Sequence, residues 1–429
     1  MTGIGTRNRP HQGEYMEKQK ASVTEIREAV NPVFNTARSC TAINALLGDD
    51  DAQKLMLPLG FDMTDLEPGG DNITPEMQVF FDQMTNPGFS IMVETRFAAS
   101  NEYIRKSGFS HIVDLPCGYT PRGIKFADTG IWYYGLDLPA VTEEIEPAAK
   151  GVTGENERIR YFDVDATNYT SLKKALSGVQ GELLITTEGL LMYLTQSELD
   201  EVFQNIRMLL EEHGGEWITT DNEILAAHFR LLDVLSDDPY APASAQLPPS
   251  TPGNDFLDCS KALQYAGKMG FDVKKVPVYN YLPEKLLSLS RMPADRQHAV
   301  RDTFKEMYFC VMTVKEDQPR AETGEERPFS IRSDHVNDRL NIALSGRLDT
   351  ITAPELLSVF RNACEKGEVR SVFIDLRHTS YISSAGLRVF VIILKSLETG
   401  EQLHLGNMND SVREILDMTG FSGLCSCDD

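Results

Sequence analysis

The chain has 429 residues, with 64 Asp and Glu against 41 Lys and Arg, which gives a net charge of −23 at pH 7. At roughly 100–200 residues per domain, this length predicts two or three domains. The composition, 41% hydrophobic and 24% charged, is that of a folded globular protein. Because so negative a surface repels phosphate backbones and anionic lipid, we expect no nucleic-acid or membrane partner.

The cysteines and the apolar segments indicate the compartment. The sequence has no run of about 20 apolar residues, and its polar N-terminus lacks the apolar stretch of a secretory signal. Seven cysteines, an odd number spread over a long chain, do not indicate a disulfide framework. Cys425 and Cys427 have no second pair nearby, so we expect no metal site. The cytoplasm is the expected location.

Irregular stretches divide the chain. The first 20 residues are expected to be flexible, and the charged stretch 316–328, with two prolines, is expected to be a linker. The linker separates a domain over 21–315 from one over 329–429. Within the first domain, the proline-rich stretch 236–256 is too long for an ordinary connection, and it predicts a lid-like insertion.

From about residue 110, short β-rich runs alternate with longer amphipathic ones. Strands are predicted at 111–116, 132–138, 159–165, 182–189, 216–221 and 306–314, and helices at 121–129, 141–149, 169–177, 196–211 and 222–235. This alternation predicts an α/β fold, a Rossmann-like and mostly parallel sheet with helices on both faces. Ligands of such sheets bind outside the carboxyl ends of the strands.

Polar residues follow each of the first four strands. Gly118 follows the first strand and would let a backbone approach a ligand closely. Asp137 lies 19 residues later, near the spacing of a carboxylate that accepts both ribose hydroxyls, although it could be an ordinary loop acid. Asp165 could accept from an adenine amino group or cap the next helix. Glu188 is either a ligand contact or a cap.

Taken together, these acids favour one kind of ligand. Three acids and few bases along one sheet edge would repel a pyrophosphate but suit ribose, adenine and a positive charge. S-adenosylmethionine has these groups and no phosphate. A nicotinamide dehydrogenase is disfavoured, because Pro116 and Pro121 stand where the outer glycines of the dinucleotide pattern would be. With Thr120 as N-cap, Pro121 is expected to begin a helix.

The segments DLPCGYTPRG, GLDLP, FDVDA and TEGLLMYL resemble those of class I methyltransferases. More narrowly, they resemble the leucine carboxyl methyltransferase family, which includes polyketide O-methyltransferase-like enzymes, over about residues 20–315. The resemblance implies an enzyme that uses S-adenosylmethionine to methylate a carboxyl or hydroxyl group of a small molecule. In the family an upstream Arg holds the methionine carboxylate, and Arg96 matches it. Pro116 departs from the family, which more often has Gly there.

By the same resemblance, Gly118 approaches the cofactor and Asp137 binds the ribose. Asp165 with Ala166 frames the adenine, and Glu188 contacts the methionine end. The resemblance does not identify a general base, and a carboxylate acceptor would need none. Tyr193, Asp221 and His228 could face the acceptor, but each is expected to be structural.

Residues 329–429 predict a second, small α/β domain whose segments GRLDTITAPEL, VFIDLRHTSYISSAGLRVF and DMTGF resemble a STAS domain, the anti-sigma factor antagonist module. The resemblance implies that Ser384 is phosphorylated and that Asp349 lies near the same surface. A helix begins at the serines, where phosphate is electrostatically tolerated. Ser383 replaces the usual acid before the phosphorylated serine. A docking module without phosphorylation is the alternative.

Two functions follow from the two domains. The first is a methyltransferase with a STAS domain for regulation or for docking to an anti-sigma-type kinase or another STAS-binding protein. The second is a signalling protein whose first domain has lost catalysis and only senses a nucleoside ligand.

Overall fold

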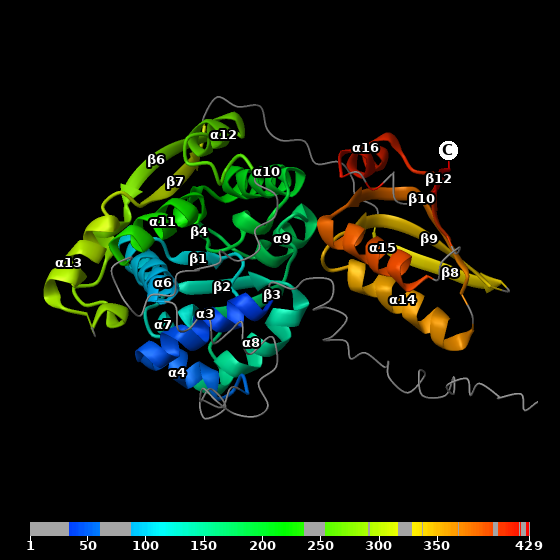
Figure 1. Ribbon diagram of the computed structural model, residues 1–429. Helices are drawn as coiled ribbons and strands as arrows, with labels where there is room; N and C mark the ends of the chain where they lie inside the picture. The colour runs from blue at the N-terminus through cyan, green and yellow to red at the C-terminus, as the bar shows by residue number, and fades with distance from the viewer. Residues whose placement is uncertain are drawn as a thin grey trace, which may run out of the picture.

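The computed structural model (Figure 1) contains two units, each built on its own sheet. It describes residues 34–60, 87–235, 254–290, 292–315, 328–336, 338–367, 369–397, 402–419, 421 and 426–428. We call the described residues up to 315 the first unit and those from 328 the C-terminal unit. The N-terminal stretch predicted to be flexible and most of the predicted lid and linker lie outside the described residues.

The first unit contains a seven-stranded sheet with the order β3-β2-β1-β4-β5-β7-β6. Its strands are β1 (His111–Asp114), β2 (Trp132–Asp137), β3 (Ile159–Asp163), β4 (Leu183–Thr187), β5 (Gly215–Thr219), β6 (Phe271–Pro277) and β7 (Tyr308–Val314). The first five are parallel, and β7 runs antiparallel between β5 and β6. The mostly parallel α/β sheet is thus confirmed. Strand order reverses between β1 and β4, the switch point at which such sheets bind ligands.

Helices cover both faces of this sheet (Figure 1). They are α3 (Phe34–Leu47), α4 (Asp50–Met56), α6 (Pro87–Ser107), α7 (Arg122–Lys125), α8 (Pro139–Thr153), α9 (Tyr169–Leu176), α10 (Gln196–His213), α11 (Ile224–Leu235), α12 (Ala262–Lys268) and α13 (Ala294–Thr303). The five predicted helices are present, though α7 is only four residues long. β6 was not predicted, because only its first residue, Phe271, is fully buried and its pattern is weak.

Neighbouring residues of each strand face opposite layers. Val113 packs with Phe203 of α10 on one face, whereas Ile112 packs with α6 and α11 on the other. Phe203 is the centre of an aromatic cluster. Its ring centroid lies 4.6 Å from that of Trp217 and 4.9 Å from that of Tyr265, both edge-on. α10 begins with a capping box in which Thr195 and Glu198 bond each other's backbone N–H groups.

The C-terminal unit is a five-stranded sheet with the order β12-β11-β10-β9-β8. Its elements are β8 (Ser330–Val336), β9 (Arg339–Leu348), α14 (Ala353–Lys366), β10 (Ser371–Ile382), α15 (Ser384–Ser396), β11 (Gln402–Gly406), α16 (Asp410–Met418) and β12 (Ser426–Asp428). The small mixed α/β fold is confirmed, with β8 antiparallel to β9. Ser383 caps α15, because its side chain accepts from the N–H groups of Ala385 and Gly386.

Within the described ranges, no helix combines the length and apolar content needed to cross a bilayer. No group of three or more His, Cys, Asp or Glu side chains there could hold a metal ion. The side chains of Cys425 and Cys427 lie outside the described part.

Replacing Phe203 with Ala should destabilise the first unit by about 3–5 kcal/mol, because the cavity would lie among aromatic rings that cannot collapse into it. Both tryptophans, Trp132 and Trp217, lie in the first unit, so urea unfolding followed by tryptophan fluorescence reports this unit alone. The control is Phe229→Ala, whose ring is 57% exposed and whose loss should cost no more than about 0.5 kcal/mol. Equal midpoints for the two variants would contradict the packing described here.

Candidate functional site

Acidic side chains lie along the carboxyl edge of the parallel strands, as predicted. Asp114 is the last residue of β1 and Asp137 the last of β2. Asp165 and Glu188 follow the ends of β3 and β4. The strand register aligns Asp137 with Asp163 of β3, and Asp114 with Thr186 of β4, so the acids form a row across the switch point.

Asp137 lies directly against the backbone of Gly118. The Gly118 N–H donates to Asp137 Oδ2 at 2.7 Å, and the Leu138 N–H donates to Oδ1 at 2.7 Å. Burial raises the pKa of Asp137 to about 7, although these two bonds oppose the shift. Gly118 has a φ of +52°, and a β-carbon there would lie 3.5 Å from Ala37 Cβ of α3. The predicted glycine and acid are therefore adjacent, and α3 covers them.

A buried arginine that the sequence reading did not select links two of the acids. Arg122 is fully buried, and it donates to Asp114 Oδ1 at 2.6 Å, to Glu188 Oε1 and to Asn101 Oδ1 at 2.9 Å. Arg96 Nε lies 3.4 Å from Glu188 Oε2. Glu188 is therefore paired with two cations and caps no helix. Even beside Arg122, burial raises the pKa of Asp114 to about 6.

The helix expected after the first strand differs from the prediction. α7 begins at Arg122 with Pro121 as its N-cap, and no side chain caps it. Thr120 Oγ1 instead lies 3.4 Å from Asp114 Oδ2. The reason is that Arg122 must reach Asp114, which fixes the turn one residue later. The four-residue α7 is too short to supply the anion-binding helix start expected from the sequence.

Asp165 and Ala166 occupy the turn between β3 and α9. Asp165 Oδ1 accepts from the Thr167 N–H at 2.8 Å and from Thr167 Oγ1 at 2.6 Å. The Ala166 carbonyl accepts from Asn205 Nδ2 at 2.9 Å. The alternative that Asp165 caps α9 is wrong, because Asn168 is the N-cap. The remaining oxygen of Asp165, Oδ2, accepts at 2.9 Å from the N–H of Thr350, which belongs to the C-terminal unit.

The three residues considered for the acceptor side, Tyr193, Asp221 and His228, have different surroundings. Asp221 is fully buried and accepts from the N–H groups of Gly189, Leu190 and Leu191 at 2.8–2.9 Å, which makes it structural, as expected. Tyr193 lies in the short turn Leu191–Tyr193 that these bonds hold. His228 is buried in α11.

A cavity of about 330 Å³ lies beside α6. Phe97 and Asn101 line it and also contact Arg122, the ring of Phe97 at 5.2 Å from the guanidinium carbon. Its other lining residues are Asn44, Leu47, Asp49, Glu94, Ala98, Glu102, Arg105, Lys125, Pro283, Lys285 and Leu287. None of the six predicted cofactor residues lines this cavity.

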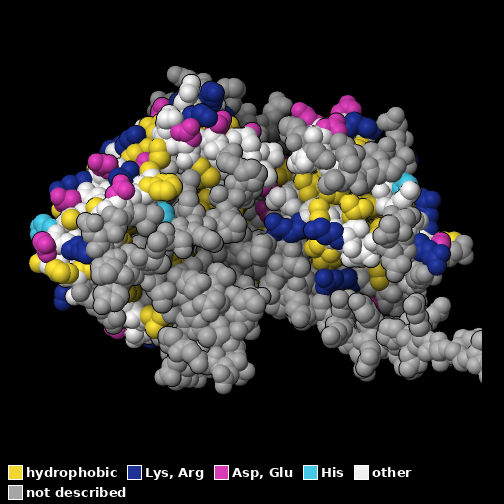
Figure 2. All heavy atoms as spheres, viewed as in Figure 1, with side chains coloured by type: hydrophobic (Ala, Val, Ile, Leu, Met, Phe, Trp, Pro, Cys, Tyr) yellow, Lys and Arg dark blue, Asp and Glu magenta, His cyan; other side chains and the backbone are white. Residues whose placement is uncertain are grey.

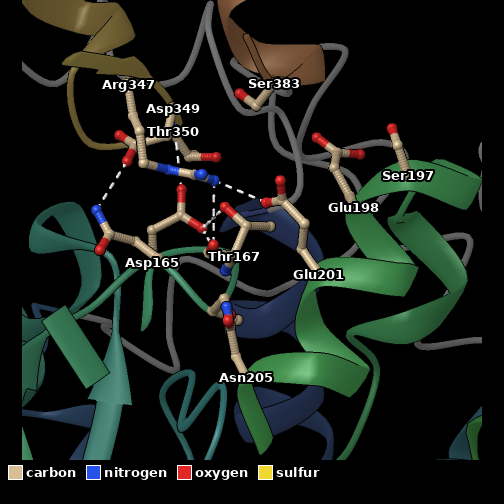
Figure 3. Close-up of polar contacts among 12 residues, drawn as sticks. Asp165, Thr167, Ser197, Glu198, Glu201, Asn205, Arg347, Asp349, Thr350 and Ser383 are labelled. Carbon is tan, nitrogen blue, oxygen red and sulfur yellow. Dashed lines mark hydrogen bonds and ion pairs between the residues drawn. The ribbon is translucent and has the colours of Figure 1, made fainter. Parts of the chain in front are cut away.

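The C-terminal unit docks on the first unit next to Asp165 (Figure 3). Besides the Thr350 bond, Arg347 of β9 donates to Glu201 Oε2 at 2.7 Å and to the Thr167 carbonyl at 3.1 Å. Asn168 Nδ2 donates to Asp349 Oδ2 at 3.2 Å. We call this set of contacts the junction. It was not foreseen, since it pairs residues that lie more than 140 positions apart.

Ser384, the predicted phosphorylation site, also lies in the junction. Its N–H and its hydroxyl donate to Glu198 Oε1 at 2.9 and 2.7 Å. The other oxygen of Glu198 closes the capping box of α10. The first turn of α15 thus meets a carboxylate from the first unit, the charge that a helix N-terminus favours.

Comparison with known proteins identifies the C-terminal unit. Residues 330–427 match the family model for the STAS domain. The protein BtrV of Bordetella bronchiseptica, named as an anti-sigma factor antagonist, is 35% identical over 94 residues, which cover 22% of this chain and 80% of BtrV. An anti-sigma-B factor antagonist of Staphylococcus aureus is 31% identical over 84 residues, covering 19% of this chain and 77% of that protein.

Among solved structures, the chain is similar to magnesium protoporphyrin IX methyltransferase (ChlM) from Synechocystis PCC 6803 with bound SAH. The identity is 11%, the TM-score is 0.32, and the match covers 65% of this chain and 100% of that chain.

Replacing Arg122 with Met should destabilise the first unit by about 3–5 kcal/mol, because Asp114 would remain buried without a cation and Glu188 would keep only Arg96. The matched control is Arg105→Met in α6, whose side chain is 48% exposed, pairs with Glu102 at 3.4 Å and lies 5.7 Å from the ring centroid of Phe126, so that the loss should stay below about 1 kcal/mol. Urea unfolding at pH 7.5 measures both. A stability of Arg122→Met equal to that of the control would refute the ion network.

Proposed function

The chain belongs to the STAS family through residues 330–427, and we propose that its first unit is an S-adenosylmethionine-dependent methyltransferase that this domain regulates. Its reaction would be O-methylation of a carboxyl or hydroxyl group of a small molecule. The observation that carries it is the pairing of Asp137 with Gly118 at the switch point of the sheet. The pairing supplies a carboxylate for the ribose next to a backbone that admits a close approach.

The residues present fit this cofactor. Arg96 Nε is buried, lies 3.4 Å from Glu188 Oε2 and makes no hydrogen bond among the described residues, so this guanidinium would be the cation that meets the cofactor's carboxylate. Asp137 would accept the ribose hydroxyls, and the turn at Asp165 and Ala166 would frame the adenine. The row of acids favours a cationic, phosphate-free nucleoside over a dinucleotide. When bound, the cofactor supplies a methyl group made electrophilic by its sulfonium.

The chain's own contribution would be placement. Arg122 fixes Glu188, and Asp221 fixes the turn after it through three backbone bonds, so that the edge near the methionine end is rigid before a ligand arrives. No side chain is assigned as a base. A carboxylate acceptor is already ionised at neutral pH and needs none.

The second candidate function, a nucleoside sensor without catalysis, is favoured by the junction. The contact between Thr350 and Asp165 links the candidate cofactor site directly to a signalling domain. An assay of methyl transfer distinguishes the methyltransferase from the sensor. A protein that binds the cofactor but transfers no labelled methyl group to a metabolite extract of its own cells would be the sensor.

The relatives' names support a role for the C-terminal unit in anti-sigma signalling, with a kinase of that type or another STAS-binding protein as partner. Ser384 is the proposed phosphorylated residue. It begins α15, so a phosphate there would receive the helix's free N–H groups once it is clear of Glu198.

Asp137→Asn should weaken binding of S-adenosylhomocysteine at least about tenfold, since a hydrogen bond to a charged group contributes about 1.5–3 kcal/mol. Isothermal titration calorimetry measures the dissociation constant. The matched control is Asp163→Asn, which removes an exposed carboxylate from the same sheet edge and should leave the constant unchanged. An unchanged dissociation constant in Asp137→Asn would contradict the assignment of the cofactor pocket to this edge of the sheet.

Binding should also depend on pH through Asp137, whose pKa is about 7 in the free protein. Ribose hydroxyls need the ionised carboxylate, so its pKa falls on binding and affinity is full above pH 7 and lost as the pH falls below it. Between pH 8 and pH 6 the dissociation constant of S-adenosylhomocysteine should rise about tenfold. In Asp137→Asn the weaker binding should be nearly independent of pH, and a wild-type constant flat over this range would contradict the assignment.

Protein isolated from its native cells should carry phosphate on Ser384, detected by mass spectrometry of the peptide that contains it. Ser384→Ala should remove the modification, whereas Ser383→Ala, which loses only the helix cap, should retain it. Phosphate on Ser383 alone would contradict the assignment.

A further inference from the structure

The junction brings four carboxylates close together. The first unit contributes Asp165, Glu198 and Glu201, the C-terminal unit contributes Asp349, and Arg347 donates to Glu201. In the view of Figure 2, Lys and Arg side chains lie at the margin of the C-terminal lobe that faces the first lobe. The basic margin of the C-terminal unit thus faces acids of the first unit, whereas the contact itself is rich in acids.

In the docked state, the C-terminal unit occupies Asp165, the side chain proposed to bind the adenine. Asp165 is 3% exposed. Its Oδ1 already accepts two bonds from Thr167, and its Oδ2 accepts the Thr350 N–H (Figure 3). An exocyclic amine that approaches Asp165 from outside the sheet therefore meets the Thr350 loop, and this loop must withdraw before Oδ2 is available.

We propose that the docked C-terminal unit is an intramolecular lock on the cofactor site: the Thr350 loop and the cofactor compete for Asp165, and negative charge at Ser384 opens the lock. The inference rests on the proposed function, because it takes Asp165 as the adenine contact. It goes beyond that function by assigning the Ser384 surface of the STAS domain an occupant within the same chain, the acidic rim formed by Asp165, Glu198 and Glu201.

Ser384 is placed to open the lock. Both of its donors bond Glu198 Oε1, so a phosphate on its hydroxyl would replace a donor by a group carrying about two negative charges against a buried carboxylate. Glu201 lies on the same face of α10, one turn on, and would add to the repulsion. A partner that binds the Ser384 surface would likewise have to displace the first unit.

Three further features of the junction are unfavourable to the docked state. The hydroxyl of Tyr381, buried beneath Arg347, has no hydrogen-bond partner among the described residues. Burial raises the pKa of Glu201 to about 7, with Arg347 opposing the shift and Asp165 and Glu198 adding to it. Burial also raises the pKa of Asp349 to about 6, with Asp165 adding to the shift and Asn168, Thr352 and Arg347 opposing it. Docking therefore takes up protons and weakens as the pH rises through this range.

If docking weakens cofactor binding, cofactor binding must weaken docking to the same extent. This reciprocity can be tested without measuring catalysis. The amide hydrogens of Thr350 and Ser384 bond the first unit, so their exchange with deuterium reports docking in the full-length protein. Adding S-adenosylhomocysteine to the wild type should speed the exchange of both segments. Arg347→Glu should do the same without ligand, and it should lower the dissociation constant of S-adenosylhomocysteine about fivefold or more.

Matched variants separate release from a general change of charge. Arg332→Glu and Ser333→Asp alter exposed residues of β8, which lies at the sheet edge beyond β9, and should match the wild type. Ser384→Asp should behave as Arg347→Glu does. The charge swap Arg347→Glu with Glu201→Arg should restore slow exchange and the wild-type dissociation constant, which a misfolded variant could not do.

The outcomes distinguish this inference from the function beneath it. Fast exchange in Arg347→Glu with an unchanged dissociation constant would overturn the lock and leave the cofactor site standing. No binding of S-adenosylhomocysteine by the wild type, Arg347→Glu or Ser384→Asp would overturn both. Exchange unchanged in every variant would overturn the lock by showing that the junction does not hold the two units together.

Discussion

The buried guanidinium of Arg122 is the interaction on which the geometry of the site depends. β1 and β4 are neighbours, and each delivers an acid to the same edge, Asp114 and Glu188. Two carboxylates so close and so buried would repel each other and lose their hydration, and removing either from water is costly unless a cation replaces the solvent. Arg122 supplies that cation to both. The carboxyl edge at the switch point is therefore fixed by charge pairing, and the remaining acids of the row do not have to serve this structural purpose.

Those remaining acids are held by neutral donors. Asp137 receives two backbone N–H groups, and Asp165 receives donors from Thr167 and Thr350. Neither makes a salt bridge among the described residues. A buried carboxylate without a cation is unfavourable for folding, and such groups cluster at sites where a ligand later supplies the missing interaction. The contrast between cation-paired and amide-held acids is the physical basis for assigning the second kind to ligand binding.

Features set by local patterns, such as strand ends and helix caps, could be predicted from the sequence. Features set by contacts between distant residues could not. The ends of β1 to β5 follow from apolar runs, and the acids after them fall where parallel strands must end together. The cap at Ser383 follows from the helix pattern after it. Arg122 stood in a quoted motif, but nothing local shows that it reaches two acids, 8 and 66 positions away. The burial of Arg122 could have been suspected only from Asp114, because a buried acid at the end of a strand needs a cation nearby. β6 has only a weak burial pattern, and the junction has no local signal.

A junction made of a few polar bonds can still hold the two units, because both belong to one chain. Tethering makes docking an intramolecular event with a high effective concentration, so that a contact too weak to form between separate proteins is populated when the partners are linked. The same weakness makes it reversible. An obligate apolar interface would bury the acids permanently. An acid-rich contact that has one ion pair among the described residues, Arg347 with Glu201, needs only a small difference in ligand affinity between the docked and released states to shift. A STAS domain on the same chain could thus respond to the site next to it without a large conformational change in either sheet.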